Sequence, residues 1–309
     1  MELLHPLGRD ELALTGRDPA AAVERGEITR IRHGRYVDAD AWDGAFSEAR
    51  ELALARAAVA ATLGGAVLSH TTAAAVWGLP LFRHRPDRAH VIVRRRTSGS
   101  STGSLIRHRD RWDGEVQVLD GMPVTTLPRT VYDVMRSASI ETAVCCADAA
   151  LRSVAVREGS REVDLGRAEE LRADIAEILA RSSGKRGVKQ ARLVLAFADP
   201  RAESPGESVS RLYLDRMGFR DIRLQVAVAS WAERPFEIDL EFAGVLGEFD
   251  GQAKYALRGG DVAEAVRAEK RREDWIRART GRRMVRWGMP EIRSYETFRG
   301  FLTGLGIRP

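Results

Sequence analysis

The chain has 309 residues, of which 44% are hydrophobic and 30% are charged, and its net charge is +5. This balance excludes wholesale disorder and is typical of a chain that forms hydrophobic cores. The longest apolar stretch, residues 57–68, is about twelve residues long and is too short to cross a bilayer. The length predicts two or three domains.

Three features of the composition bear on compartment and partners. The first residues contain early acids and no apolar core, so we expect no secretory leader. Cys145 and Cys146 are the two cysteines, and adjacent cysteines cannot build a disulfide framework, which predicts a reducing cytoplasm. All but four of the 49 basic residues are arginines, which are good bidentate partners for phosphate. This mild basic excess permits nucleic-acid binding without establishing it, and no membrane partner is expected.

Residues 1–45 predict a short helix followed by a β-hairpin. A capping residue at Asp18 and a proline directly after it predict a helix that ends at Gly26. Alternation of apolar and polar residues over 28–37, around Gly34, predicts the hairpin. Three arginines cluster at its tip and would either contact phosphate or face solvent: Arg30, Arg32 and Arg35.

Residues 46–199 predict a second region of helices and strands. An alanine-rich helical stretch covers 46–80, and His70, which follows a helix cap at Ser69, is expected to be structural. Strands are expected over 89–93, 104–108, 116–119 and 124–127, and helices over 129–152 and 165–198 with a break at 182–184. The proline- and serine-rich run 199–206 marks the best domain boundary, so the expected domains are 1–45, 46–199 and 200–309.

The C-terminal region has the order of an α/β unit around a mixed sheet. Helices are expected over 207–217 and 262–280, strands over 224–228, 237–242, 245–249 and 284–287, and a final helix follows. The whole chain is therefore expected to be a multidomain protein of mixed α+β and α/β class.

The sharpest chemical signal is a hairpin rich in carboxylates. The strand over 237–242 alternates apolar and acidic residues, and Ala243-Gly244 suits a two-residue turn. The register then opposes two pairs of acids: Asp239 with Glu248, and Glu237 with Asp250. Directly opposed Cβ atoms lie about 5 Å apart, and opposed like charges destabilise a sheet. A divalent cation would offset this repulsion and activate a water for phosphodiester hydrolysis; a solvated acidic face is the alternative.

Other residues near the hairpin are candidates for the same chemistry. Lys254 lies just past the second strand, where an ammonium group can stabilise phosphate charge or be an ordinary loop lysine. Glu207 follows Ser204 at the spacing of a capping box, so it is either a helix cap or a site residue. Lys270 and Arg271 lie on a basic helix face that suits phosphate contacts or solvent.

Three segments of the C-terminal region carry a family pattern: Ser204-Pro205-Gly206-Glu207, Ile238-Asp239-Leu240 and Gly247-Glu248-Phe249-Asp250-Gly251. They resemble a bacterial domain of the PD-(D/E)XK restriction-endonuclease-like superfamily, in the branch related to very-short-patch mismatch repair endonucleases. The resemblance covers about residues 200–309 and implies Mg²⁺ or Mn²⁺ held by Glu207, Asp239 and Glu248. Asp250 stands at the superfamily's lysine position, and Lys254 stands where the related branch often has histidine, so both are further catalytic candidates.

The front of the chain carries a second pattern, over about residues 1–155. It includes Glu24-Arg25-Gly26-Glu27-Ile28-Thr29, Ser69-His70-Thr71-Thr72-Ala73 and Thr125-Thr126-Leu127-Pro128-Arg129-Thr130. These segments resemble actinobacterial proteins with an AbiEi-type antitoxin region. The resemblance implies a winged helix-turn-helix, here truncated to residues 1–45, with DNA as a partner and a cognate toxin as a further one.

Three functions are compatible with these observations. The first is a DNA-interacting protein whose C-terminal domain is a metal-dependent endonuclease. The alternative is a non-catalytic DNA-binding regulator or antitoxin of a type IV toxin–antitoxin-like system, in which the nuclease fold is kept as a scaffold. This alternative is favoured by Asp250, which stands where the superfamily has its lysine. A third is a toxin-neutralising protein that contacts no nucleic acid.

Overall fold

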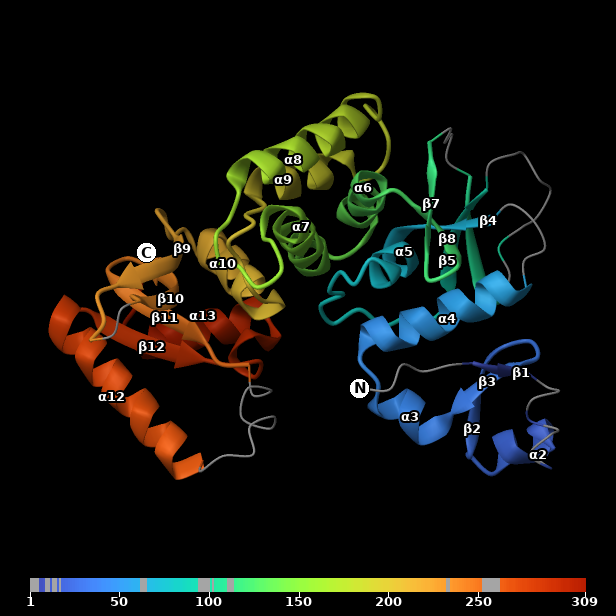
Figure 1. The fold of residues 1–309 in the computed structure, drawn as a ribbon, viewed down its shortest axis with the longest axis horizontal. Helices are drawn as coiled ribbons and strands as arrows, with labels where there is room; N and C mark the ends of the chain where they lie inside the picture. The colour runs from blue at the N-terminus through green and yellow to red at the C-terminus, as the bar shows by residue number, and fades with distance from the viewer. Residues whose placement is uncertain are drawn as a thin grey trace. The chain divides into compact units, whose positions relative to one another are not determined.

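The computed structural model describes residues 6–8, 12, 16, 18–61, 66–93, 101, 103–109, 114–231, 234–251 and 262–309. The chain divides into two compact units (Figure 1). The N-terminal unit consists of Met1–Arg157 and Asp164–Ala198, and the C-terminal unit of Glu158–Val163 and Asp199–Pro309. Both combine helices with strands, which confirms the expected multidomain α+β class.

The N-terminal unit begins with a helix and a small antiparallel sheet. Its elements are β1 (Leu7–Gly8), α2 (Pro19–Glu24), β2 (Ile28–Arg32), β3 (Arg35–Asp38) and α3 (Ala39–Gly44). Asp18 caps α2 by accepting a hydrogen bond of 3.1 Å from the backbone N–H of Ala20. Strands β2 and β3 pair antiparallel, so the predicted hairpin is confirmed, and β1 pairs with β3 as a short third strand.

A five-stranded sheet follows, with the order β6-β5-β4-β8-β7. Its strands are β4 (Ala66–Leu68), β5 (Ala89–Val93), β6 (Leu105–His108), β7 (Val116–Leu119) and β8 (Met122–Thr125), and helices α4 (Ser47–Ala61) and α5 (His70–Val76) belong to the same region. Strand β4 lies inside the stretch that we expected to be wholly helical. It is the central strand, and a short run of apolar residues does not distinguish a buried strand from a buried helix.

A layer of helices completes the N-terminal unit: α6 (Leu127–Ser137), α7 (Ile140–Ala155), α8 (Leu165–Ala180) and α9 (Val188–Phe197). The single helix expected over 129–152 is wrong, because the chain breaks at Ala138 and restarts at Ser139. The Ser139 hydroxyl caps α7 by accepting from the Thr142 N–H at 3.2 Å. Cys145 and Cys146 are buried free thiols on α7. In the described part of the chain, no helix has both the length and the apolar composition that a bilayer crossing requires.

The C-terminal unit has a four-stranded mixed sheet with the order β12-β11-β10-β9. Its elements are α10 (Pro205–Met217), β9 (Arg223–Val228), β10 (Phe236–Phe242), β11 (Val245–Phe249), α12 (Val262–Thr280), β12 (Arg283–Trp287), the short 3-10 helix η1 (Glu291–Arg293) and α13 (Tyr295–Gly304). Strands β9, β10 and β11 pair antiparallel, whereas β11 and β12 are parallel. The parallel pair needs a crossover, which α12 provides.

Each face of this sheet packs against helices. Leu246 and Met284 share an apolar cluster with Ile276 of α12. On the other face, the ring of Trp287 lies 5.2 Å from that of Phe298 on α13. Residues of α12 and of the strands β10, β11 and β12 line the candidate site.

Candidate functional site

The turn between β10 and β11 has the predicted form. Ala243 and Gly244 have φ angles of 48° and 73°, and positive φ at both central residues is the mark of a type I′ hairpin turn. Leu240 pairs with Gly247, and Phe242 with Val245. The antiparallel pairing agrees with the predicted register from Leu240 to Val245, and Asp239 and Glu248 are the next residues beyond it on the two strands.

Four of the five acids of this hairpin line a single cleft of about 350 Å³. They are Glu237, Asp239, Glu248 and Asp250. The cleft also contains Glu203, Gln225 and Glu269 together with three arginines, Arg161, Arg272 and Arg286. These four carboxylates therefore lie along one cleft, and the same walls also carry arginines.

Asp239 lies on β10 at a point where the regular pairing with the neighbouring strands is interrupted. One of its carboxylate oxygens, Oδ2, accepts a hydrogen bond of 2.8 Å from the backbone N–H of Phe249 on β11. On the other side, the register places it opposite Gln225 of β9, whose φ of 50° departs from strand conformation. The Gln225 side-chain amide donates to Glu207 at 2.9 Å. This irregularity brings Asp239, Gln225 and Glu207 together.

Glu207 is both a helix cap and a neighbour of the cleft. Its carboxylate accepts hydrogen bonds from the Glu203 N–H at 2.9 Å and from the Ser204 hydroxyl at 2.8 Å. The side chain is buried, and burial and then the charge of Asp239 raise its pKa to about 7. The two interpretations of Glu207 left open by the sequence are therefore compatible, because one carboxylate has several acceptor sites.

The raised pKa of Glu207 makes the stability of the C-terminal unit depend on pH. Between its ordinary pKa of 4.5 and the folded value of about 7, the folded chain binds more protons than the unfolded chain. The free energy of unfolding therefore falls as pH rises through this window, by about 2–3 kcal/mol, and stays low above it. We expect Glu207→Gln to abolish most of this fall, as measured by urea unfolding at pH 4.5 and pH 8.

The exposed neighbour Glu203 provides the matched control: its charge is the smallest of the influences on the pKa of Glu207, so Glu203→Gln should keep most of the pH dependence of the wild type. An unchanged pH profile in Glu207→Gln would show that the Glu207 carboxyl titrates normally.

Glu248 belongs to an arginine–glutamate network formed by Glu248, Glu269, Arg272 and Arg286. Arg272 contacts both acids, and Nη2 of Arg286 lies 2.8 Å from Oε2 of Glu248 and also contacts Glu269. Burial opposes ionisation of Glu269, but hydrogen bonds from Arg272 and Arg286 outweigh it and lower its pKa. We expected a metal ion to offset the repulsion between the carboxylates of the hairpin. Among the described residues, arginines reduce this repulsion at Glu248.

Two further acids of the hairpin, Glu237 and Glu241, have basic partners as well. Glu237 forms an ion pair of 2.6 Å with Arg161, and the buried Glu241 lies 3.1 Å from Arg223 and 2.7 Å from Arg282. Arginine supplies all of these ion pairs, which is consistent with the arginine-rich composition of the chain.

The predicted phosphate-contacting residues have different surroundings. Lys270 and Arg271 are exposed on α12. Lys254 lies outside the described residues. In the N-terminal unit Arg30 is exposed, but Arg32 is half-buried, and its Nη1 is buried without a hydrogen-bond partner among the described residues. Burial, and then the charge of the nearby Arg107, lower the pKa of Arg32. The Arg32 side chain is therefore directed into the unit. Arg35 is half-buried.

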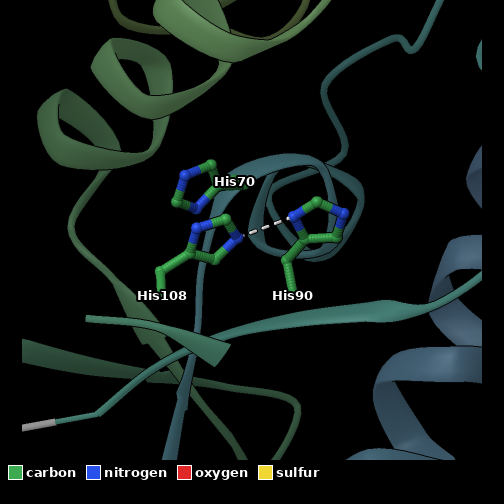
Figure 2. Close-up of side chains that lie close together, drawn as sticks. All are labelled: His70, His90 and His108. Carbon is green, nitrogen blue, oxygen red and sulfur yellow. Dashed lines mark hydrogen bonds between the residues drawn. The ribbon is translucent and has the colours of Figure 1, made fainter. Parts of the chain in front are cut away.

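A second cluster was missed from the sequence. His70, His90 and His108 each offer a ligand atom, and these atoms lie within 4.8 Å of one another. Nδ1 of His90 lies 2.9 Å from Nε2 of His108, and the His108 ring stacks on that of His70 at 3.5 Å (Figure 2). Among the described residues, this is the group of at least three potential metal ligands whose ligand atoms all lie that close together. The acids of the cleft do not form such a group. Only the sheet brings these histidines together.

No family model matches the sequence. Two proteins of Mycobacterium tuberculosis are similar to it: "Uncharacterized protein Rv2248" of strain ATCC 25618 / H37Rv and "Uncharacterized protein MT2308" of strain CDC 1551 / Oshkosh. Each is 30% identical to this chain over 221 residues, which cover 70% of the chain and 70% of the relative. The chain therefore belongs to the same family as these mycobacterial proteins.

Proposed function

We propose that the protein binds DNA and that its C-terminal unit is a divalent-metal-dependent endonuclease, which hydrolyses or nicks phosphodiester bonds at the acidic cleft. The observation that carries this proposal is the proximity of Asp239 to the buried Glu207, beside a cleft that also contains three arginines. Carboxylate oxygens suit a hard cation, and guanidinium groups suit phosphate. The likeness of the hairpin motifs to PD-(D/E)XK domains supports the same function.

The donor set fits Mg²⁺ or Mn²⁺, because Glu207, Asp239 and Glu248 supply only carboxylate oxygens. Burial and the charge of Asp239 raise the pKa of Glu207, as expected for two acids that share a site. A divalent ion relieves such repulsion, lowers the pKa of a bound water and stabilises charge on the phosphate.

The protein's own side chains position the phosphate. Arg272 and Arg286 line the cleft while they hold Glu248 and Glu269, so a phosphodiester that enters the cleft competes with these acids for the same guanidinium groups. Asp250 lines the same cleft and stays our candidate to complete the coordination of the cation, and Lys254 stays our candidate for stabilising phosphate charge.

Aromatic side chains beside the cleft favour a nucleic acid over a small phosphate. Trp231 is 55% exposed and Trp275 40% exposed, and their ring centroids lie 5.5 Å apart. Trp231 also lies 4.8 Å from Phe236, which lines the cleft. Exposed rings of this kind stack on unpaired bases, and the basic residues Lys270 and Arg271 lie on the same helix as Trp275.

Replacing Asp239 by asparagine should lower the rate of DNA nicking at least about 100-fold, because the substitution removes a charged cation ligand. The asparagine side-chain oxygen can still accept from the Phe249 N–H, so the hairpin should be retained. The measurement is conversion of supercoiled plasmid, and cleavage of a mismatched duplex, by the full chain with Mg²⁺ or Mn²⁺.

The control variant is Glu237→Gln, which changes an acid of the same strand and the same cleft that is paired with Arg161. It should keep most of the activity. Equal activity of wild type and Asp239→Asn would remove the nuclease assignment.

One observation favours a second function, a DNA-binding regulator or antitoxin-like protein without catalysis. Glu248 already bridges Arg272 and Arg286, as in a scaffold held together by ion pairs. Titration calorimetry with Mn²⁺ distinguishes the two functions: this second one requires salt-dependent DNA binding without heat from Mn²⁺. For either function we propose a cytoplasmic location, since both cysteines are buried free thiols.

A further inference from the structure

We propose that His70, His90 and His108 form a transition-metal site in the N-terminal unit, and that its preferred ion is Zn²⁺. This site is separate from the acidic cleft in position and in chemistry, because it offers only imidazole nitrogens. Zn²⁺ favours nitrogen ligands and a tetrahedral arrangement, and Mg²⁺ favours oxygen.

The three ligands come from neighbouring elements, the strands β5 and β6 and the helix α5. His90 and His108 lie on the parallel strands β5 and β6, where Ile92 is the register partner of His108. Because side chains two residues apart in a strand lie on the same face, His90 and His108 project from the same side of the sheet. His70 begins helix α5, and the three ligand atoms converge within 4.8 Å.

The backbone around the cluster locks His90 to the segment that carries His70. The Ser69 N–H donates to the His90 carbonyl at 3.0 Å, and the His90 N–H donates to the Thr72 hydroxyl at 2.8 Å. Thr72 in turn donates to the fully buried Glu51 at 2.8 Å. Two of the three ligands are thus held in place by hydrogen bonds of the backbone, as a metal site requires.

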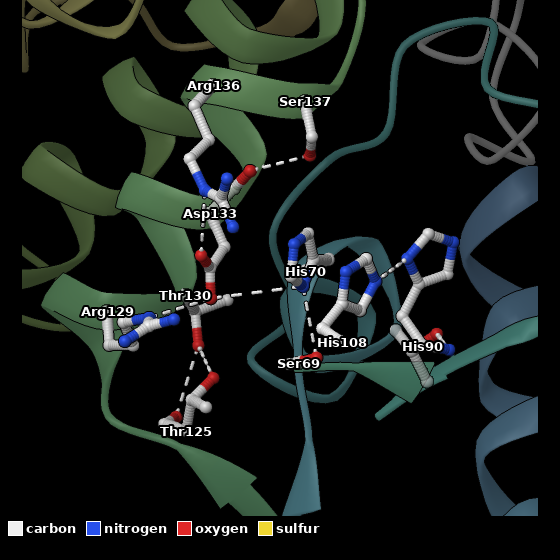
Figure 3. A network of polar contacts seen from close by, with 11 residues as sticks. Ser69, His70, His90, His108, Thr125, Arg129, Thr130, Asp133, Arg136 and Ser137 are labelled. Carbon is white, nitrogen blue, oxygen red and sulfur yellow. Dashed lines mark hydrogen bonds and ion pairs between the residues drawn. The ribbon is translucent and has the colours of Figure 1, made fainter. Parts of the chain in front are cut away.

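His70 has the surroundings of an oriented ligand. Its φ of 53° is rare for a residue with a side chain, and Ser69, at the N-cap of α5, contacts His70 Nδ1 at 3.0 Å instead of capping the helix. Nδ1 also lies 3.9 Å from Oδ2 of the buried Asp133 (Figure 3). Metal-binding histidines usually direct their second nitrogen to a carboxylate or hydroxyl, so Nε2 of His70 is the assigned ligand atom.

The ligand count indicates the type of site. Three histidines leave one position of a tetrahedral ion for water or another exchangeable ligand, as in zinc sites that are not purely structural. His90 and His108 are only half-buried, so solvent reaches this side of the cluster. A bound ion takes the place of the proton shared between Nδ1 of His90 and Nε2 of His108.

The test is metal binding by the full-length protein after treatment with a chelator. Titration calorimetry with Zn²⁺ should give a single ion per chain, and Co²⁺ should produce the visible absorption bands of a tetrahedral nitrogen site. His90→Ala and His108→Ala should each lower Zn²⁺ affinity by more than about 100-fold, and Asp133→Asn by about 10- to 100-fold.

Two variants are controls. His33→Ala changes an exposed histidine of the same unit, and Asp239→Asn changes the acidic cleft; both should bind Zn²⁺ like the wild type. The proposal is overturned if the wild type binds no Zn²⁺ at micromolar concentration, or if the histidine variants bind it equally well. Should a variant fail to fold, the Co²⁺ spectrum of the wild type decides, because oxygen ligation gives weak octahedral bands.

Discussion

Replacing Asp133 by alanine is expected to lower the free energy of unfolding of the N-terminal unit by about 3–5 kcal/mol, because it leaves buried positive charge without its partner. Asp133 is completely buried on α6, where it pairs with Arg129 at 2.8 Å and Arg136 at 3.2 Å. Arg129 is itself only 7% exposed, so water cannot replace the lost carboxylate. Urea unfolding followed by circular dichroism measures the loss, and hydrogen exchange of α6 amides assigns it to this unit.

The exposed acid Asp174 on helix α8 of the same unit serves as the comparison. Asp174→Ala should change the free energy of unfolding by less than about 0.5 kcal/mol. Similar losses from the two substitutions would mean that the Asp133 carboxylate does not hold Arg129 and Arg136 in place.

Gly187→Ala should also lower the free energy of unfolding by about 3–5 kcal/mol. Two effects add up to this loss: the left-handed backbone conformation disfavours a side chain, and the new Cβ atom clashes with the backbone. Gly187 precedes α9 with a φ of 81°, and a Cβ atom at this position would lie 1.9 Å from the carbonyl oxygen of Arg136. Both atoms belong to the close packing of α9 on α6, so relief requires one helix to move. The same urea unfolding experiment measures the loss.

Gly184 separates the two causes, because its φ of 80° is nearly identical and a Cβ added there meets nothing within 4 Å. Gly184→Ala should therefore lower the free energy of unfolding by only about 1–2 kcal/mol. If the two variants lose equal stability, the backbone clash at Gly187 is not a real constraint.

Strong local signals made most elements predictable. The strand Val245–Phe249 and the helix Val262–Thr280 have the predicted bounds, because alternation and helical periodicity are long enough to be unambiguous there. Strand β4 was missed because three apolar residues are too few to show a period, although Gly64-Gly65 stands before them in the sequence. The break before α7 was missed because only the cap at Ser139 marks it.

The site was predictable only in the part that is local in sequence. The turn at Ala243-Gly244 fixes the hairpin register, so the sharing of one cleft by its acids followed from the sequence. The arginines that pair with Glu248 come from α12 and β12, and their distance depends on tertiary packing. The histidine cluster joins residues up to 38 positions apart, from His70 to His108, and isolated histidines carry no spacing signal.

All members of the arginine–glutamate network lie on β11, α12 and β12, which together form one β-α-β crossover. Glu207 and Asp239 precede this crossover in the chain. One continuous stretch of the chain, residues 248–286, thus carries the whole network. Because Glu248 is also a proposed cation ligand, a substitution that breaks this network should change cation binding and phosphate contacts together.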